Sequence, residues 1–243
     1  MASKLLDVIY RDDHIIAINK PPGLLVHRSA LDKHETKFAV QMLRDQTGQH
    51  VYPAHRLDRP TSGVLVFAFN SEMAAALGHA MMQRDVKKHY LAMVRGWMKG
   101  SGVIDYALKY KLDKIADKHR RPERDAQDAV TDYSVMSRYE LPYASGRYAT
   151  SRYSLVALFP RTGRKHQIRR HLVHLRHPII GDTTHGDGKQ NKFLRTAFTF
   201  ENLALSCTQM RFTHPFTQAP VSITAEPHSG FRQLLAEWGA YQL

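Results

Sequence analysis

The feature that most constrains the fold is an unbroken apolar run at residues 64–69 (VLVFAF), directly after a short polar loop. A run of this length, rich in valine and phenylalanine, predicts a strand that is covered on both faces and therefore lies inside a sheet. The loop at residues 55–63 contains Pro60 and Gly63, which are typical of turns. Its polar side chains are therefore expected at the mouth of a buried strand, where a rigid scaffold can hold catalytic groups.

Asp58 is the leading candidate for chemistry in this loop. Two cations, Arg56 and Arg59, lie beside it in the sequence and are expected to hold its carboxylate ionised. The hydroxyls of Thr61 and Ser62 can hydrogen-bond a carboxylate or the chain that turns around it. Two interpretations stay open from these residues alone. Asp58 is either a reactive carboxylate or part of a surface turn that pairs with a neighbouring arginine, since exposed pairs of this kind are common and weak.

The length and charge of the chain narrow the class of protein. Its 243 residues are 43% hydrophobic, enough to bury a full core, and no internal repeat or linker divides them, so a single domain is predicted. The 35 basic residues less the 22 acidic ones leave a net charge of +13, which indicates a polyanionic partner. Nucleic acid is the commonest such partner, and an anionic membrane surface is the second.

Nothing in the sequence indicates export or insertion into a membrane. No run approaches the roughly 20 apolar residues that span a bilayer, and residues 1–7 lack the apolar core of a secretory signal. The lone Cys207 cannot form an internal disulfide or a cysteine-based zinc site, which suits a reducing cytosol. We therefore expect a cytoplasmic protein that makes no membrane contact.

Hydrophobic periodicity and turn residues predict the elements of the chain. Strands are expected at residues 5–10, 15–19, 64–69, 87–97, 129–139, 152–159, 203–213 and 221–225. Helices are expected at residues 37–46, 72–82, 189–198 and 231–238, with another from about residue 165. Ser71 is the expected N-cap of the second helix, and Gly100 and Gly102 are expected to open a turn.

Residues 161–176 form a second stretch with chemical meaning, because they contain six Lys or Arg and no acidic residue. Such a run should bind phosphate. On a helix from about residue 165, Arg169 lies beside a buried stripe made by Ile168, Leu172 and Leu175. A partly buried guanidinium needs a carboxylate, and Asp58 can supply it. The alternative is that Arg169 pairs with an unrelated acid.

A third basic stretch lies at residues 109–124, with seven Lys or Arg against three acidic residues. It predicts an exposed arm, which either contacts RNA or is a solvated loop. Four histidines near the second stretch could suggest a metal site: His166, His171, His174 and His177. They lack a nearby Glu or Cys to complete a ligand set, so we predict no metal there and expect them to face phosphate or to pack in the core.

Several enzyme classes are disfavoured. No glycine-rich loop followed by Lys-Ser or Lys-Thr is present, which argues against a nucleotide-driven motor or kinase. Glycoside hydrolysis needs two carboxylates, and only Asp58 stands in a convincing setting. Ser62 has no His and acid at a recognisable nucleophile elbow.

Ordered motifs in the chain resemble those of a known family, the RluA-type pseudouridine synthases. They are His55-Arg56-Leu57-Asp58, Thr61-Ser62-Gly63, Lys88-His89-Tyr90, Thr162-Gly163-Arg164-Lys165-His166-Gln167-Ile168-Arg169 and His177-Pro178-Ile179-Ile180-Gly181-Asp182. Each motif alone is modest, but together and in order they are specific, and the likeness extends over nearly the whole chain.

The resemblance implies an α+β fold, with a mixed, mostly antiparallel central sheet flanked by helices and loops. It implies that residues 1–243 form one catalytic domain, without the small N-terminal S4-like RNA-binding domain that some relatives carry. The implied reaction breaks the N1–C1′ bond of uridine, turns the base and joins C5 to C1′. This isomerisation involves no redox change or net hydrolysis, so no cofactor or metal is expected.

The resemblance also implies roles for individual residues. Asp58 is the essential carboxylate, Tyr90 packs on the flipped uracil and Arg169 pairs with Asp58. Arg56 takes the place of the flipped base in the stack, because a base inside a helix must be extruded before it can react. The other residues expected to contact RNA are His55, Arg59, Thr61, Ser62, Lys88, Arg164, Lys165 and Ile180.

The likeness within the family is strongest to members that act on tRNA, and it implies uridine 65 in the usual tRNA numbering. The same chemistry on ribosomal RNA is one alternative, since the charge pattern does not distinguish the two RNAs. A non-catalytic RNA-binding protein on the same scaffold is the other. We expect a monomer that needs no protein partner.

Overall fold

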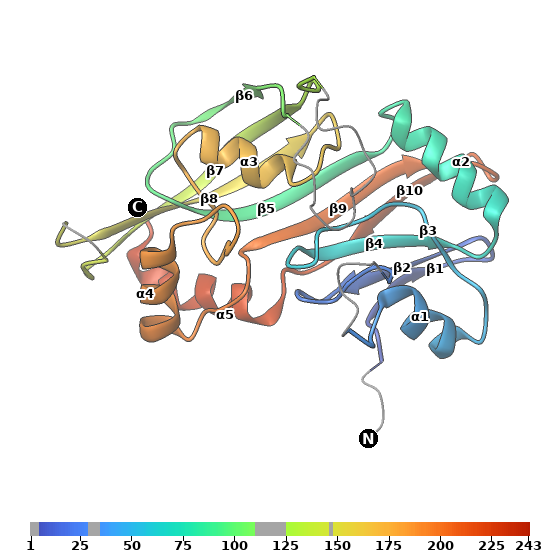
Figure 1. Cartoon of the computed structure of the whole chain (residues 1–243), viewed down its shortest axis with the longest axis horizontal. Helices are drawn as coiled ribbons and strands as arrows, with labels where there is room; N and C mark the ends of the chain where they lie inside the picture. Colours follow the sequence, from blue (N-terminus) through green and yellow to red (C-terminus); the bar gives the residue numbers. More distant parts are fainter. Residues whose placement is uncertain (1–4, 29–34, 110–124, 146–147) are drawn as a thin grey trace.

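The computed structural model describes residues 5–28, 35–109, 125–145 and 148–243. Over this part of the chain, ten strands form one sheet in the order β1-β2-β4-β9-β5-β8-β7-β6, with β10 beside β9 and β3 beside β4 (Figure 1). The strands are β1 Val8–Arg11, β2 Ile15–Lys20, β3 Tyr52–Pro53, β4 Ser62–Ala68, β5 Lys87–Arg95, β6 Ser101–Asp105, β7 Val130–Leu141, β8 Ser151–Pro160, β9 Leu205–Thr213 and β10 Pro220–Thr224. The helices are α1 Ala39–Thr47, α2 Ser71–Met82, α3 Gln167–His174, α4 Gly188–Phe198 and α5 Ser229–Trp238, with a 3-10 turn η1 at Gly239–Tyr241.

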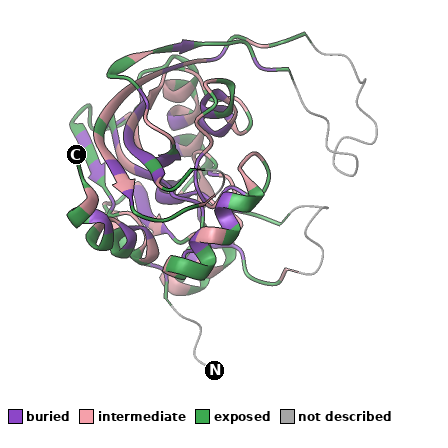
Figure 2. Ribbon diagram, turned by 90° about the vertical axis from the view of Figure 1, so that its left-hand side faces the viewer, coloured by how far each residue is buried: buried purple, intermediate pink, exposed green. Residues whose placement is uncertain are grey.

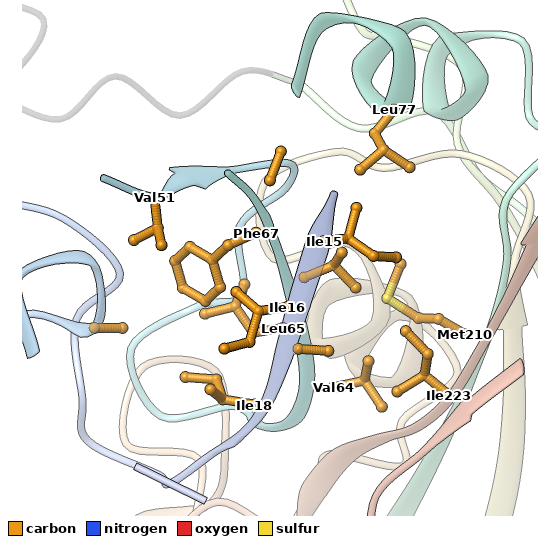
Figure 3. Close-up of a cluster of buried hydrophobic side chains, with 14 of the residues drawn as sticks. Ile15, Ile16, Ile18, Val51, Val64, Leu65, Phe67, Leu77, Met210 and Ile223 are labelled. Carbon is orange, nitrogen blue, oxygen red and sulfur yellow. The ribbon is translucent and has the colours of Figure 1, made fainter. Parts of the chain in front are cut away.

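Strand β4 is the buried strand that the apolar run predicts. All seven of its residues are buried, so both of its faces are covered. In Figure 3, Phe67 lies beside Val51, whereas Val64 lies near Met210 and Ile223. The prediction of a strand inside a sheet is confirmed, and the loop that contains Asp58 enters the sheet at this strand.

The central pairing of the sheet joins distant parts of the chain. Strand β4 runs parallel to β9, whereas the other pairings between described strands are antiparallel, which confirms a mixed, mostly antiparallel sheet. At the β4–β9 contact Gly63 has a φ of 105°, and an added Cβ would lie 2.1 Å from the carbonyl oxygen of Cys207. Only glycine fits there, because any side chain would separate the two strands.

Two clusters of buried hydrophobic side chains lie along the sheet. One joins β2 and β4 to α1 and α2, and the other joins β5 and β8 to α3, α4 and α5. Figure 1 shows α1 and α2 over one half of the sheet and α4 and α5 over the other half, and Figure 2 shows buried segments gathered in the interior. Tyr90 on β5 packs against both clusters and therefore lies where the two halves meet.

Helix starts differ from the sequence expectation in two places. The N-cap of α2 is Asn70, not Ser71, because the side chain of Asn70 accepts a hydrogen bond of 2.8 Å from the backbone N–H of Met73. Helix α3 begins at Gln167, later than residue 165, because His166 has a left-handed φ of 54°. The other predicted elements begin and end within a few residues of their expected bounds, whereas β3, β6 and η1 are not predicted by the sequence.

The glycines near residue 100 do not mark a simple turn. Gly102 lies within strand β6, which pairs with β7, so the expectation of a turn through both glycines is wrong. A Cβ on Gly102 would lie 2.9 Å from the hydroxyl oxygen of Tyr133, directly across the ladder. The glycine therefore makes room for an aromatic ring on the neighbouring strand.

Two other expectations concern the basic arm and the absence of membrane spans. Apart from Lys109, the predicted basic arm at residues 109–124 lies outside them. Among the helices that are described, none is long and apolar enough to cross a membrane.

Candidate active site

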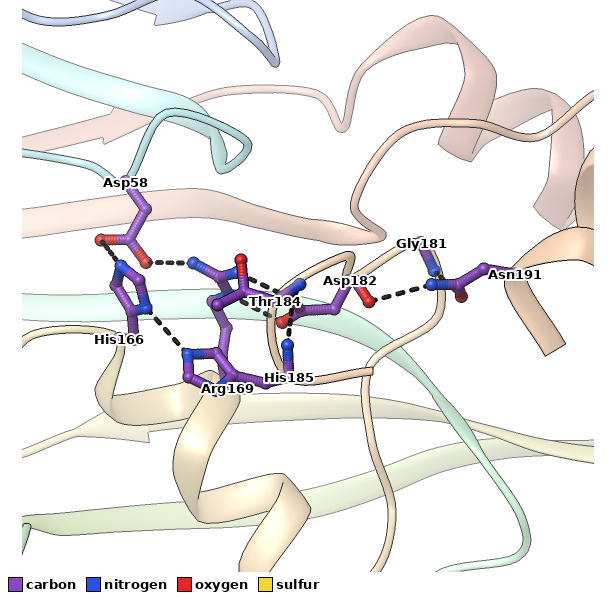
Figure 4. A network of polar contacts seen from close by, with 8 residues as sticks. All are labelled: Asp58, His166, Arg169, Gly181, Asp182, Thr184, His185 and Asn191. Carbon is purple, nitrogen blue, oxygen red and sulfur yellow. Dashed lines mark hydrogen bonds and ion pairs between the residues drawn. The ribbon is translucent and has the colours of Figure 1, made fainter. Parts of the chain in front are cut away.

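The site is built around one buried arginine that contacts two carboxylates (Figure 4). Arg169 on α3 is 2% exposed. Its Nε and Nη2 donate to the two carboxylate oxygens of Asp182, at 2.7 and 2.8 Å. Its Nη1 donates to Oδ2 of Asp58, at 3.2 Å. Arg169 therefore meets Asp58 as predicted, but its closer and bidentate partner is Asp182, the unrelated acid left open by the sequence.

The charges of this cluster stabilise one another. Burial alone would lower the pKa of the Arg169 guanidinium, but the carboxylates of Asp182 and Asp58 outweigh it and raise that pKa. Burial alone would raise the pKa of Asp182, but the hydrogen bonds from Arg169 and from two backbone N–H groups lower it. Arg169 and Asp182 are thus held as a charged pair inside the protein, with Asp58 at the solvent-facing end.

Asp182 is fixed by the turn that follows it. Its Oδ1 accepts hydrogen bonds from the backbone N–H groups of Thr184 and His185, each at 2.9 Å. Asn191 on α4 donates to the Asp182 carbonyl and accepts from the N–H of Gly181 (Figure 4). Gly181 has a φ of 76°, and a Cβ there would lie 1.9 Å from the carbonyl oxygen of Asn202. The turn therefore orients Asp182, and through it Arg169.

The loop that contains Asp58 is held by a buried lysine. Lys20 is fully buried, and its Nζ donates to the carbonyl oxygens of Pro21, Leu24 and Arg59, at 2.9–3.0 Å. Burial lowers the pKa of Lys20 to about 7, against the opposing effect of the Asp58 carboxylate. Lys20 thereby ties the loop after β2 to the loop before β4, which fixes the backbone next to Asp58.

Tyr90 presents a phenol ring beside this cluster. On β5 it is paired with Cys207 of β9 and with Leu158 of β8, and its ring is partly exposed. Burial, the neighbouring Cys207 and the Asp58 carboxylate raise the pKa of Tyr90 well above its ordinary value, so the phenol stays protonated. A neutral aromatic face next to Asp58 is suited to stacking against a planar base.

Two histidines extend the cluster away from Asp58. Nε2 of His166 lies 3.9 Å from Oδ1 of Asp58, and its Nδ1 lies 2.8 Å from Nε2 of His185. Among the residues that the structure describes, no group of three or more His, Cys, Asp or Glu side chains is placed to hold a metal ion.

The loop residues proposed to contact RNA fall into two groups. Arg56 and Arg59 are exposed, although Arg59 pairs with Glu35 and with the carbonyl of Gly23 rather than with Asp58. The cation that contacts the Asp58 carboxylate is instead Arg169. The other side chains of the loop are more enclosed.

Thr61 and Ser62 are 3% and 0% exposed, and Ser62 donates to the carbonyl of Leu205 at 3.4 Å. The half-buried His55 ring accepts a hydrogen bond from the N–H of Val66 through Nε2. These three side chains therefore support the Asp58 loop in this structure, and direct contact of Thr61 or Ser62 with RNA is not available while they are buried.

The remaining expected contacts also divide by exposure. Lys165 is exposed, Arg164 is partly exposed and donates to the carbonyl of Asp128, and Lys88 is partly exposed beside Tyr90. Ile180 is 2% exposed and packs in the second cluster, so in this structure it supports the core, and its expected contact with RNA stays a prediction. A basic cavity of about 400 Å³ adjoins Lys88 but does not include Asp58, Tyr90 or Arg169. Its charged lining residues are Arg84, Lys87, Lys88, Asp132 and Arg161.

Comparison with known proteins agrees with the geometry. Residues 14–174, more than half of the chain, match the family described as RNA pseudouridylate synthase. The chain belongs to this family. It is 54% identical over 236 residues to tRNA pseudouridine synthase C of Vibrio vulnificus (strain CMCP6), with 96% of each protein covered. It is 55% identical over 234 residues to tRNA pseudouridine synthase C of Haemophilus ducreyi (strain 35000HP / ATCC 700724), again with 96% of each covered.

Solved structures support the family's fold. Human RNA pseudouridylate synthase domain containing 4 superposes with a TM-score of 0.69 at 27% identity, covering 96% of this chain and 93% of that one. Human RNA pseudouridylate synthase domain containing 1 superposes with a TM-score of 0.70 at 23% identity, covering 99% and 98%, which bears on the fold alone. The predicted α+β pseudouridine synthase fold is confirmed.

Sequence reasoning missed several residues of this family member's site. Asp182 was present in a motif, but nothing in the sequence assigned it to Arg169. The sequence placed Lys20 only in the segment that ends the first hairpin, although its position before two prolines marks a chain reversal. The sequence gives His166 a place in a motif and an expected contact with phosphate or the core, but no link to Asp58, and it gives no signal for His185.

Proposed function

We propose that this family member converts one uridine of tRNA to pseudouridine, at position 65 in the usual tRNA numbering. The observation that carries the proposal is the 3.2 Å contact between the partly exposed carboxylate of Asp58 and the buried Arg169, with Tyr90 beside them. The choice of tRNA is supported by relatives of about half-identical sequence that are named tRNA pseudouridine synthase C.

The proposed reaction requires few groups beyond these side chains. The N1–C1′ bond breaks, the base turns and C5 bonds to C1′, so the product is an isomer of the substrate. Asp58 acts at the nucleoside as nucleophile or base, because its side chain is 28% exposed whereas that of Asp182 is 1% exposed. Arg169 orients the Asp58 carboxylate with one N–H while Asp182 holds the other side of the guanidinium.

Tyr90 serves in the proposal as the platform for the base. A uridine in a helix must be turned out of its stack, which costs a few kcal/mol. The Tyr90 ring offsets part of this cost by stacking on the extruded uracil, and the exposed Arg56 fills the space that the base has left. The exposed Lys165, next to His166, and the partly exposed Lys88, two residues before Tyr90, are suited to flanking phosphates.

The first test compares Asp58→Asn with wild type on a tRNA transcript. The amide keeps the size of the side chain but loses its charge, so we expect no measurable pseudouridine while RNA affinity stays within a few-fold. Asp13→Asn, in the exposed turn between β1 and β2, is the matched control and should keep wild-type turnover. Substantial turnover by Asp58→Asn would refute the role of Asp58, and an inactive wild type that still binds tRNA would favour a non-catalytic RNA-binding protein.

The second test identifies the RNA. Pseudouridine mapping in total RNA from cells with and without the gene should show a single loss, at uridine 65 of tRNA. Modification lost only from ribosomal RNA would overturn the choice of substrate and leave the reaction intact.

The proposal includes a monomer of one catalytic domain that acts in the cytoplasm without a protein partner. Light scattering during size-exclusion chromatography should give the mass of one chain, 27.8 kDa, with activity in the same fraction.

A further inference from the structure

The pair of histidines beside Asp58 is not used by the proposed chemistry. His166 precedes α3 with a left-handed φ of 54°, a conformation that is uncommon outside glycine but that histidine, like asparagine, adopts more often than most residues. This backbone turns the ring toward Asp58, as Figure 4 shows. The side chain is 24% exposed, with Nε2 on the side of Asp58 and Nδ1 facing His185.

The tautomer of His166 decides which of its ring nitrogens can take up a proton. A neutral imidazole has one N–H, and Nδ1 lies 2.8 Å from Nε2 of His185, within hydrogen-bond reach. Nε2 lies 3.9 Å from the carboxylate of Asp58, beyond the range of an N–H···O bond. Of the two tautomers, the one with its hydrogen on Nδ1 donates to Nε2 of His185 and leaves Nε2 of His166 able to accept a proton. Nε2 keeps its lone pair on the side of Asp58.

The isomerisation requires a base at this place. Once C5 has bonded to C1′, it still carries its hydrogen, and this proton must leave so that the C5–H electron pair can form the C5=C6 double bond. N1, whose bond to C1′ has broken, takes up one proton, so the number of protons is unchanged overall. C5 is then one bond from C1′, the atom nearest to the proposed action of Asp58.

We propose that His166 is the proton acceptor for C5 and that His185 positions it, an inference that rests on the proposed function. Nε2 of His166 takes the C5 proton, and the resulting imidazolium lies next to the carboxylate of Asp58, which stabilises it. Nε2 then gives this proton up to solvent, which restores the resting form, while Nδ1–H keeps its hydrogen bond to His185. His185 is itself fixed, because its backbone N–H donates to Asp182.

The charges around His166 suit a base. Burial lowers the pKa of His166, the carboxylates of Asp58 and Asp182 raise it, and the cations of Arg169 and Lys165 lower it, with a lowered pKa as the result. The ring is therefore neutral at pH 7. Turnover should fall when the pH drops through this lowered pKa, because protonation removes the lone pair of Nε2.

The test uses variants that keep the backbone of His166. Asparagine and glycine accept a positive φ, so His166→Asn and His166→Gly should fold and melt like wild type. Single-turnover rates on tRNA should fall about 100-fold or more, the range for loss of a general base. Deuterium at C5 of the target uridine should slow both variants more than it slows wild type, because C5–H cleavage has become rate-limiting. Added imidazole should restore part of the rate of His166→Gly.

Controls separate this inference from the proposed function. Release of the C5 hydrogen from tRNA by wild type tests the function itself, whatever the variants do. His174→Asn changes an exposed histidine on the same helix, stacked on Tyr106, and should keep the wild-type rate. Variants of His166 that fold and keep the wild-type rate, or that show the wild-type isotope effect, would overturn the role of His166.

The role of His185 has its own readout. His185→Leu removes the acceptor for Nδ1–H, which leaves the imidazolium less stabilised and should move the acid limb of the pH–rate profile to lower pH. His185→Gln keeps an acceptor oxygen and should restore the wild-type limb. An unchanged profile in His185→Leu would refute the positioning role.

Discussion

At the scale of the residue, one buried cation serves two carboxylates with different tasks. Arg169 binds Asp182 through two hydrogen bonds and Asp58 through one. The carboxylate of Asp182 is almost inaccessible, whereas more than a quarter of the Asp58 carboxylate is exposed. Breaking a buried pair leaves an uncompensated charge, while losing a partly exposed partner costs much less. Stability therefore depends on Asp182, and chemistry on Asp58.

This division predicts different outcomes for two equivalent substitutions. Asp182→Asn should lower the free energy of unfolding by about 3–5 kcal/mol, because Arg169 loses its buried counter-charge. Asp58→Asn should lower it by about 1 kcal/mol or less. Urea unfolding followed by circular dichroism measures both values. Equal losses in the two variants would contradict the division of tasks.

A second residue-scale prediction concerns acid stability. Burial and the nearby Lys88 lower the pKa of His55 to about 3, so between pH 6.5 and 3 the unfolded chain binds a proton at His55 that the folded protein does not. Stability from this group is therefore complete above pH 6.5 and falls as the pH drops through that window. His55→Gln keeps an acceptor for the N–H of Val66 and should flatten the loss by up to about 1.4 kcal/mol per pH unit. Parallel stability curves for variant and wild type from pH 7 to 4 would refute the buried neutral ring.

At the scale of the element, close backbone contacts decide where loops and strands can lie. Gly63 allows β4 to approach β9, and Gly181 allows the Asp182 turn to approach Asn202. Lys20 joins two loops through three carbonyl oxygens. Gly63 ends the loop that contains Asp58, Gly181 directly precedes Asp182, and Lys20 binds the carbonyl of Arg59, next to Asp58. These contacts therefore position the site as well as the core.

Two glycine substitutions separate strain from steric clash. Gly63→Ala combines an unfavourable φ of 105° with a contact of 2.1 Å to the Cys207 carbonyl, and should cost about 3–5 kcal/mol from strain and overpacking together. Gly48→Ala has a φ of 68° but nothing within 4 Å of the new Cβ, and should cost about 1 kcal/mol. Thermal unfolding of both proteins provides the comparison. A similar loss in the two would show that the β4–β9 approach is not tight.

Local sequence patterns predicted most strands and helices well, but they predicted contacts between residues far apart in the sequence poorly. The apolar run at residues 64–69 predicted β4 because burial on both faces leaves a continuous signal in the sequence. Strand β6 was missed because Gly102 reads as a turn residue unless the facing Tyr133 is known. The spacing of Ile168 and Leu172 correctly placed Arg169 in the interior, but periodicity cannot say which distant acid folds against it. The residues alone offered Asp58 or an unrelated acid as the partner of Arg169, and the family resemblance favoured Asp58; Asp182 had to be found in the structure.

At the scale of the whole molecule, the net charge of +13 attracts an RNA partner over a longer range than any single contact. Binding that neutralises phosphates releases counterions, so affinity falls with salt. Neutralising Lys114, Lys118, Arg120 and Arg121 of the predicted basic arm should flatten the slope of log K against log salt by about 0.7–0.9 for each phosphate that the arm no longer neutralises. Filter binding of tRNA over a range of salt concentrations measures the slope.

The control for this prediction changes the net charge equally elsewhere. Four exposed cations on α4 and α5 serve this purpose: Lys189, Lys192, Arg195 and Arg232. Their neutralisation should change the slope less than that of the arm. The same slope change in both sets would assign the effect to overall charge, and no change in the arm variant would make the arm a solvated loop.

The position of β9 also bears on how the protein is made. This strand lies between β4 and β5 in the sheet, but it begins only at Leu205, long after both neighbours have left the ribosome. Until then the nascent chain carries two central strands with unpaired edges, which are prone to join other chains. Because β9 pairs with Ser62 and with Tyr90, its arrival also brings the Asp58 loop and the tyrosine platform into register. A chain released before β9 is made would therefore be prone to aggregate and unable to modify RNA. Translation must reach the last strands before the protein can be active.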